Sequence, residues 1–130
     1  MKKAVLFGFS DFTGGLQAAN LTNRMMPLGI EVRVVEREDY LQPLGVVAGV
    51  IPTNGPFGAA EEYEGKELPV RMVLFAGIEQ EELDHVLSVC RECGVTASDL
   101  KAMLTPTNVA WSAVKLCEEL IMEHYAMGGS

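Results

Sequence analysis

Cys90 and Cys93 have the CxxC spacing of redox and metal-binding motifs. A redox-active pair needs a thiolate stabilised at the N-terminus of a helix. Here the pair falls in the last turn of a predicted helix, where the helix dipole opposes a negative charge. A zinc site needs two further ligands, and Cys117, His85 and His124 lack the spacing to supply them. We therefore interpret both cysteines as structural, and we predict no metal and no cofactor.

The stretch Ser10 to Gly15 reads SDFTGG and lies between a predicted strand and a predicted helix. Backbone N–H groups at such a helix start can bind an anion. The stretch has neither the lysine of a P-loop nor the GxGxxG spacing of a dinucleotide site. The simpler interpretation is a capped helix start, with Thr13 as the N-cap. The residues of this stretch that could bind a polar or anionic small molecule are Ser10, Asp11 and Thr13.

The strongest polar cluster is Thr105-Pro106-Thr107-Asn108, followed by Trp111, the single tryptophan of the chain. We expect Thr107 or Asn108 to cap the last helix, so that Trp111 would lie in its first turn. A similar turn, Pro52-Thr53-Asn54, occurs in the first half, and the two turns could share a ligand pocket. The candidate ligand-binding residues of this cluster are Thr105, Thr107, Asn108 and Trp111.

No Ser/His/Asp or Cys/His arrangement is supported by the positions of these residues. His85 lies on the polar flank of a predicted helix, and His124 lies near the end of another, where a cation suits the helix dipole. The carboxylates cluster in solvated first turns, so a paired general acid and base cannot be assigned. We predict no catalytic residue.

The elements that position these residues fall into two similar halves. Val5-Leu6-Phe7-Gly8-Phe9 and Val73-Leu74-Phe75-Ala76-Gly77 are near-repeats, and each precedes a polar helix start. Continuous apolar character predicts strands buried on both faces. Residues 30–37 alternate between apolar and polar, as in an edge strand with one wet face, and residues 100–105 form a second short strand. Helices are predicted at 14–26, 79–93 and 108–125.

This order predicts a single α/β domain, an α+β sandwich, over residues 1–130. Its first strand-helix-strand unit spans 1–41, a connection spans 42–69, and the second unit with an extra C-terminal helix spans 70–127. Two such units favour a ferredoxin-like arrangement, with the first strand of each unit central and the second at the edge. The alternative is a small three-layer parallel α/β domain. Within the connection, we expect Leu44 to Ile51 to pack on the core.

Composition limits the partners. The formal charge is -8, from 18 acidic and 10 basic residues, so the average field repels nucleic acid and anionic membranes. The apolar run after Met1-Lys2-Lys3 is too short for a signal peptide or a membrane span, which predicts a cytoplasmic protein. Three cysteines, an odd number, favour reduced thiols over a disulfide framework.

The second half resembles a known family. The resemblance begins at Met72-Val73-Leu74-Phe75, continues through Glu81-Glu82-Leu83 and ends with residues 100–111. The LKAxLTPTNxxW pattern of that last stretch is its specific part. Roughly residues 70–122 are similar to the bacterial family named domain of unknown function 3783. The family brings no established activity, so the resemblance implies a family signature at Thr105 to Asn108 and at Trp111, and no catalytic role.

Two functional hypotheses follow. The leading one is a non-enzymatic binding, regulatory or protein-interaction module that forms a homodimer, because open sheets often pair at their edges. The alternative is a small enzyme that acts on a polar or anionic metabolite through the SDFTGG stretch and the TPTN turn.

Overall fold

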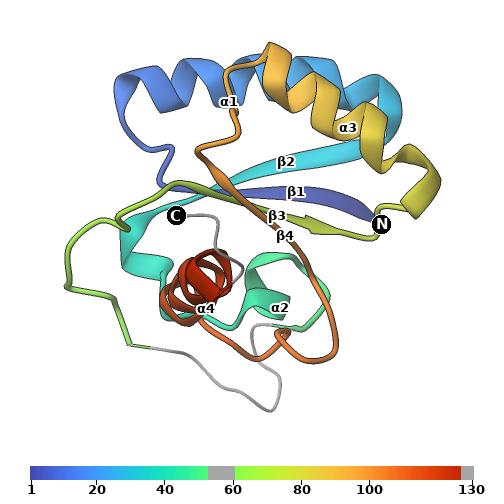
Figure 1. Ribbon diagram of the computed structural model, residues 1–130. Coiled ribbons are helices and arrows are strands. Elements are labelled where there is room, and N and C mark those ends of the chain that lie inside the picture. Colours follow the sequence, from blue (N-terminus) through green and yellow to red (C-terminus); the bar gives the residue numbers. More distant parts are fainter. Residues whose placement is uncertain (53–60, 127–130) are drawn as a thin grey trace.

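The computed structural model describes residues 1–52 and 61–126. A four-stranded sheet lies between two layers of helices (Figure 1). Its strands are β1 (Lys2–Phe7), β2 (Ile30–Val35), β3 (Met72–Ala76) and β4 (Leu100–Met103). The helices are α1 (Phe12–Met25), α2 (Leu44–Val47), α3 (Gln80–Glu92) and α4 (Ala113–Ala126), with short 3-10 turns η1 (Met26–Leu28) and η2 (Arg37–Asp39). The α/β fold class is thus confirmed.

The strand order is β2-β1-β3-β4. β1 pairs with β2 in parallel, β3 pairs with β4 in parallel, and the antiparallel pairing of β1 with β3 joins the two units. The first strand of each unit is therefore central and the second lies at an edge, as the apolar patterns predicted.

The ferredoxin-like arrangement is not confirmed. That arrangement is a split βαβ fold, in which another strand separates the two strands of a unit. Here β1 is adjacent to β2, and β3 is adjacent to β4. The three layers of the alternative prediction are present, but the sheet is mixed where that prediction has it parallel.

Each face of the sheet carries its own apolar core, because β1 and β3 are buried on both faces. On one face, Leu6 and Phe75 pack with α1 and α3 through Leu21 and Val86. On the other face, α2 and α4 cover the sheet. The residues of this second core include Phe7, Tyr40, Leu44, Leu74 and Leu116.

The helix starts differ from two of the sequence predictions. Asp11, not Thr13, is the N-cap of α1, and its Oδ1 accepts a hydrogen bond from the backbone N–H of Gly14 at 2.7 Å. α4 begins at Ala113, beyond Asn108, and the Ser112 hydroxyl accepts from the N–H of Lys115 at 3.1 Å. Neither Thr107 nor Asn108 caps α4, because the helix begins only at Ala113, and Trp111 therefore precedes it; the Asn108 side chain bonds to Thr105 and Met103 instead.

The first part of the connection packs on the second core through Leu44, Val47 and Ala48, as expected, whereas Gly49 and Val50 are exposed and do not. All four residues of α2 are buried. Farther along, the Tyr40 hydroxyl donates to Glu67, and the rings of Tyr40 and Tyr63 lie 5.8 Å apart. The fully buried Tyr40 therefore anchors the return of the chain towards β3.

Among the described residues, none of the helices combines the length and the apolar character that crossing a bilayer requires.

The two-unit architecture predicts a large cost for removing the Phe75 ring. Phe75 is 1% exposed and packs in the core beneath α1 and α3. We expect Phe75→Ala to lower the free energy of unfolding by about 3–5 kcal/mol, through lost burial and a residual cavity. Chemical denaturation followed by circular dichroism measures this loss, and a value below about 1 kcal/mol would contradict the central position of β3.

Candidate functional site

The turn after β4 is held by the buried side chain of Asn108. Its Oδ1 accepts from the backbone N–H of Thr105 at 2.9 Å, and its Nδ2 donates to the carbonyl of Met103 at 3.0 Å. The Thr105 hydroxyl in turn accepts from the N–H of Asn108 at 3.2 Å. These bonds satisfy the polar atoms of a residue that is only 7% exposed. Asn108 therefore organises the turn, and its amide is engaged within the protein.

The same turn docks α2. The carbonyls of Trp111 and Val109 accept from the N–H groups of Leu44 and Gly45, both at 2.8 Å. A Cβ atom on Gly45 would lie 2.6 Å from Cγ2 of Val109, so glycine permits this close approach. The N-terminal donors of α2 are thus bonded by protein carbonyls, and the TPTN turn with the residues that follow it acts as a clasp between the second unit and the connection.

The remaining residues of the turn lie at its surface. Thr105 and Thr107 are exposed. Trp111 is half-buried, its indole packs against the second core, and the Nζ of Lys115 lies 4.9 Å from the centre of its ring. Thr53 and Asn54 of the second predicted turn lie outside the described residues, so the shared pocket stays a prediction.

The SDFTGG stretch occupies the loop between β1 and α1. Ser10, Asp11 and Thr13 are exposed, and Gly14 is buried against the backbone of Phe9. The Asp11 carboxylate occupies the first turn as the helix cap, which leaves less room there for an anionic ligand.

The structure does not bring the two candidate clusters together. Phe7, after which SDFTGG begins, pairs with Met72 at one end of the sheet. Thr105 follows Met103, which pairs with Phe75 near the other end. The clusters are separated by about the length of β3, about 13 Å at 3.3 Å per residue. One small ligand therefore cannot contact both.

Sequence reasoning missed a polar cluster centred on Arg71, immediately before β3. Its guanidinium binds Asp99 through both carboxylate oxygens, with Nε to Oδ1 at 3.1 Å and Nη2 to Oδ2 at 2.7 Å. It also donates to Gln17 on α1 and to the carbonyl of Gly94, and it lies 4.2 Å from the centre of the Phe9 ring. Arg71 thus ties the first unit to the second. A charged residue directly before a buried strand was its signal in the sequence.

The Arg71 cluster is electrostatically balanced. Burial raises the pKa of the Asp99 carboxyl. The hydrogen bonds from Arg71 and from the Thr96 N–H, together with nearby positive charge, lower the pKa by a larger amount, so the net pKa is below the ordinary value. Asp99 is therefore ionised at neutral pH and paired with Arg71. This arrangement suits a structural ion pair more than an acid or base catalyst.

The cysteines also have structural surroundings. Cys90, Cys93 and Cys117 are free and buried. Burial raises the pKa of Cys90 to about 11, and it raises the pKa values of the other two thiols as well. A thiol with a raised pKa is a poor nucleophile at neutral pH. Within residues 1–52 and 61–126, no group of three or more His, Cys, Asp or Glu side chains could hold a metal ion.

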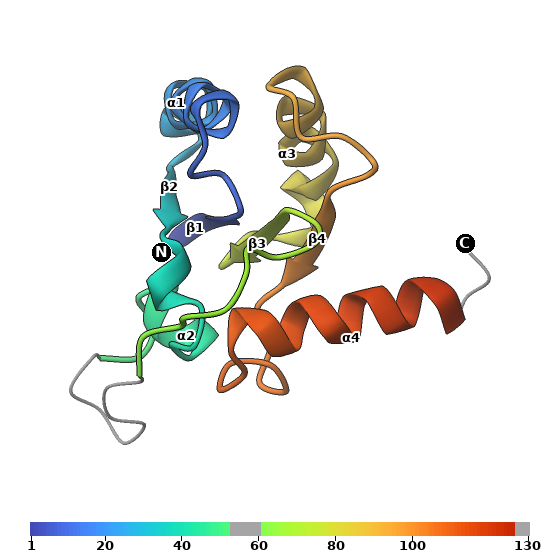
Figure 2. The ribbon, with the colours of Figure 1, turned by 90° about the vertical axis from the view of Figure 1, so that its left-hand side faces the viewer.

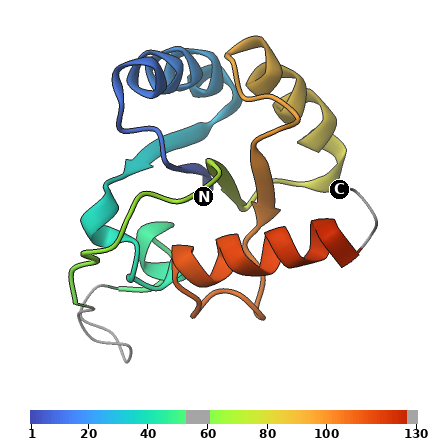
Figure 3. The same cartoon turned by 60° about the vertical axis from the view of Figure 1, so that its left-hand side comes forward.

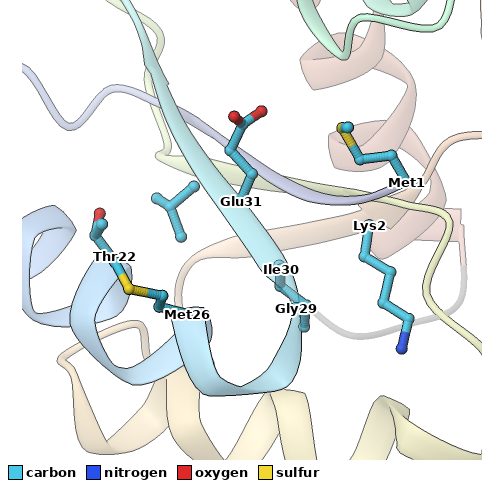
Figure 4. Close-up of a pocket in the computed structure, with 8 residues that line it drawn as sticks. Met1, Lys2, Thr22, Met26, Gly29, Ile30 and Glu31 are labelled. Carbon is cyan, nitrogen blue, oxygen red and sulfur yellow. The ribbon is translucent and has the colours of Figure 1, made fainter.

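Two of the open cavities lie beside the edge strands and are largely apolar. One, of about 360 Å³, lies between the end of α1 and β2, and Figure 4 shows Thr22 and Met26 on its helix side and Ile30 on its strand side. Another, of about 370 Å³, lies between α4 and the start of β4, and its lining includes Leu100, Ile121 and Tyr125. The described surface thus offers apolar recesses at the sheet edges.

Comparison with known protein families gives one result, in the second half of the chain. Residues 71–127 match the model of the family described as a domain of unknown function, DUF3783. The resemblance seen in the sequence is confirmed and extends to residue 127. The match contains β3, α3, β4 and α4, and therefore Arg71, Asp99 and the TPTN turn, whereas β2 lies outside it. No curated protein and no solved structure matches the chain.

The clasp predicts that Asn108 stabilises the fold. Asn108→Ala leaves the N–H of Thr105 and the carbonyl of Met103 without these partners, and we expect a loss of about 1–3 kcal/mol in the free energy of unfolding. Thr107→Ala, at the exposed neighbour, should change stability by about 0.5 kcal/mol or less. Urea denaturation compares the two variants, and equal stabilities would contradict the role of Asn108.

The ion pair predicts a specific pH dependence. Because the folded pKa of Asp99 is below its unfolded value of about 3.9, its contribution is fully present above that value and is lost as the pH falls through the folded pKa. Asp99→Asn should remove this part of the acid dependence and cost about 2–3 kcal/mol at pH 7. The exposed Asp84→Asn is the control. If the free energies of unfolding of wild type and Asp99→Asn change with pH by the same amount between pH 3 and 7, the ion pair is contradicted.

Proposed function

We propose that the chain is a non-enzymatic protein-interaction module. The observation that carries this proposal is the projection of α4 beyond the sheet. α4 starts beneath the centre of the sheet and continues past β4, so that its C-terminal turns cover no strand of their own (Figures 2 and 3). A helix that extends past its own sheet is suited to contact another molecule.

The side chains on this projecting part support a protein partner. Met122 is 65% exposed and Tyr125 is 67% exposed. Tyr125 and Ile121 also line the cavity of about 370 Å³ in the angle between α4 and β4. Tyrosine and methionine are enriched at protein interfaces, where they fill recesses of this kind. The exposed apolar side chains and the recess together form a surface that we name the α4 corner.

The polar residues make their contacts within the fold, which also favours an interaction module over an enzyme. Asn108 holds its own turn, Asp99 neutralises Arg71, and Asp11 caps α1. The alternative enzyme needs the SDFTGG stretch and the TPTN turn at one site, and these lie at opposite ends of the sheet. Recognition of apolar side chains requires no such constellation.

We also propose that the two units arose by duplication and that the module works in the cytoplasm as a homodimer. The repeated VLF segments, which form the last residues of β1 and the middle of β3, support the duplication. Three free thiols support a reducing compartment. The open edges of the sheet support self-association.

Site-specific photo-cross-linking tests the α4 corner. A benzophenone amino acid in place of Tyr125 should give a protein adduct on illumination in cells, whereas the same group in place of exposed Arg91 on α3 should not. Excess wild-type protein should suppress the adduct, and Tyr125→Asp protein should compete much less.

Two results would contradict the proposal. One is equal labelling from positions 125 and 91. The other is the absence of any adduct, together with thermal stabilisation by a phosphorylated metabolite or a nucleotide, which would favour the small-molecule alternative.

A further inference from the structure

The strand β2 presents the longer free edge of the sheet. An edge strand carries a row of backbone N–H and C=O groups that can bond another strand. β2 has six residues, whereas β4 has four. On β4, moreover, the carbonyl of Met103 already accepts a hydrogen bond from Asn108. Figure 2 shows β2 at the opposite edge from β4, with α1 on one side of the sheet and α2 on the other.

The side chains of β2 divide cleanly between the two faces. Ile30, Val32 and Val34 belong to the core beneath α1, and Val32 and Val34 are only partly buried. Glu31 and Arg33 project on the α2 side and are exposed. The edge therefore offers an apolar row on one face and a pair of opposite charges, two residues apart, on the other.

Both charged side chains of β2 are positioned by neighbours. Glu31 Oε1 lies 3.0 Å from the Nζ of Lys3, yet the Glu31 side chain remains 61% exposed. Nη1 of Arg33 donates to the carbonyl of Val47 at 2.9 Å, which leaves its other donors for a further contact. The two groups are oriented and can still accept a partner.

These charges match each other in one particular pairing. When two copies of β2 pair in an antiparallel sense around a two-fold axis at Val32, residues equally far from Val32 face each other. Glu31 of each copy then lies opposite Arg33 of the other, which gives two cross-strand pairs of opposite charge. Charged residues on an edge usually oppose pairing. In this register they favour it, because the edge is its own electrostatic complement.

The apolar face fits the same register. Val32 meets its own copy, and Ile30 lies opposite Val34 of the second copy. Ile30 also lines the cavity of about 360 Å³, together with Met26 (Figure 4). The Met26 side chain is 67% exposed. An added strand would therefore place a valine beside a recess whose lining includes the apolar side chains of Met26, Ile30 and Val32. Such recesses next to a sheet edge are the usual partners of an added strand.

We propose that two copies of this chain associate through β2 in the antiparallel register centred on Val32. The occupant of the β2 edge is a second copy, and the product is one continuous sheet of two four-stranded halves. The inference rests on the homodimer of the proposed function and specifies its interface. The interface is small, so the dissociation constant is expected in the micromolar range.

Charge reversal tests the register. Glu31→Arg and Arg33→Glu each turn both cross-strand pairs into like-charge pairs, and each should weaken self-association by about tenfold or more. The double variant Glu31→Arg/Arg33→Glu restores opposite charges across the axis and should recover the dimer. An equimolar mixture of the two single variants should form a heterodimer, because every facing pair is then again of opposite charge. Sedimentation equilibrium between 1 and 500 µM measures each case.

Two controls keep the test specific. Circular dichroism checks that each variant is folded, since Glu31→Arg also removes the contact with Lys3. Val32→Cys places a thiol on the axis, and mild oxidation should link two copies through it, while the same substitution at Val50, an exposed residue beyond α2, should not.

The outcomes separate this inference from the proposed function. Wild-type protein that stays monomeric at 500 µM would overturn both the interface and the homodimer. A dimer whose dissociation constant is unchanged by the charge reversals would overturn the β2 register, and so would single variants that fail to associate when mixed. Either result would still allow a homodimer with a different interface. A Tyr125-dependent adduct that persists in Glu31→Arg protein supports the interaction module independently of β2.

Discussion

The antiparallel pairing of β1 with β3 is the interaction on which the rest of the structure depends. It runs from Lys3 opposite Ala76 to Phe7 opposite Met72. Because both strands are apolar on both faces, each face of the sheet needs a cover, and α1 with α3 and α2 with α4 provide the two layers. The pairing also sets the direction of each unit. In a parallel α/β sheet the carboxyl ends of the strands meet and form a crevice for a ligand. Here the carboxyl ends of β1 and β3 lie at opposite ends of the sheet, so no such shared crevice forms from the two units.

This geometry explains why the polar residues serve the fold. Arg71, directly before β3, binds Gln17 on α1 and Asp99 directly before β4. At the other end, Asn108 shapes the turn that docks α2. The Arg71 clasp joins the two units, and the Asn108 clasp joins the second unit to the connection, so the polar residues Thr105 to Asn108 have a structural explanation. The surface also carries two largely apolar recesses: one at the α4 corner within the segment that matches DUF3783, and one beside β2 outside it. The two surfaces lie at opposite edges of the sheet and can act independently.

The sequence predicted the elements and their burial well, because these depend on local patterns. The VLF repeats marked the two central strands, and the alternation after Ile30 marked an edge. Strand order was harder, because the same apolar patterns suit a split and an unsplit βαβ unit. The start of α4 was misplaced because Asn108 is an equally good cap and turn former, and only the carbonyls offered to Leu44 and Gly45 decide between these roles. A charge directly before a buried strand marks Arg71 in the sequence, but its partners Gln17 and Asp99 are far away in the chain, so no local pattern reveals the cluster itself.

If the edges of the sheet are the working surfaces, backbone hydrogen bonds must form at β2 when two copies meet. Hydrogen–deuterium exchange of wild-type protein over a range of concentrations measures this most directly. We predict that amides within Glu31 to Val34 exchange more slowly as the concentration rises through the association range, while the amides of β4 are unchanged. Exchange at β2 that is independent of concentration, or protection that develops at β4 in its place, would contradict the account.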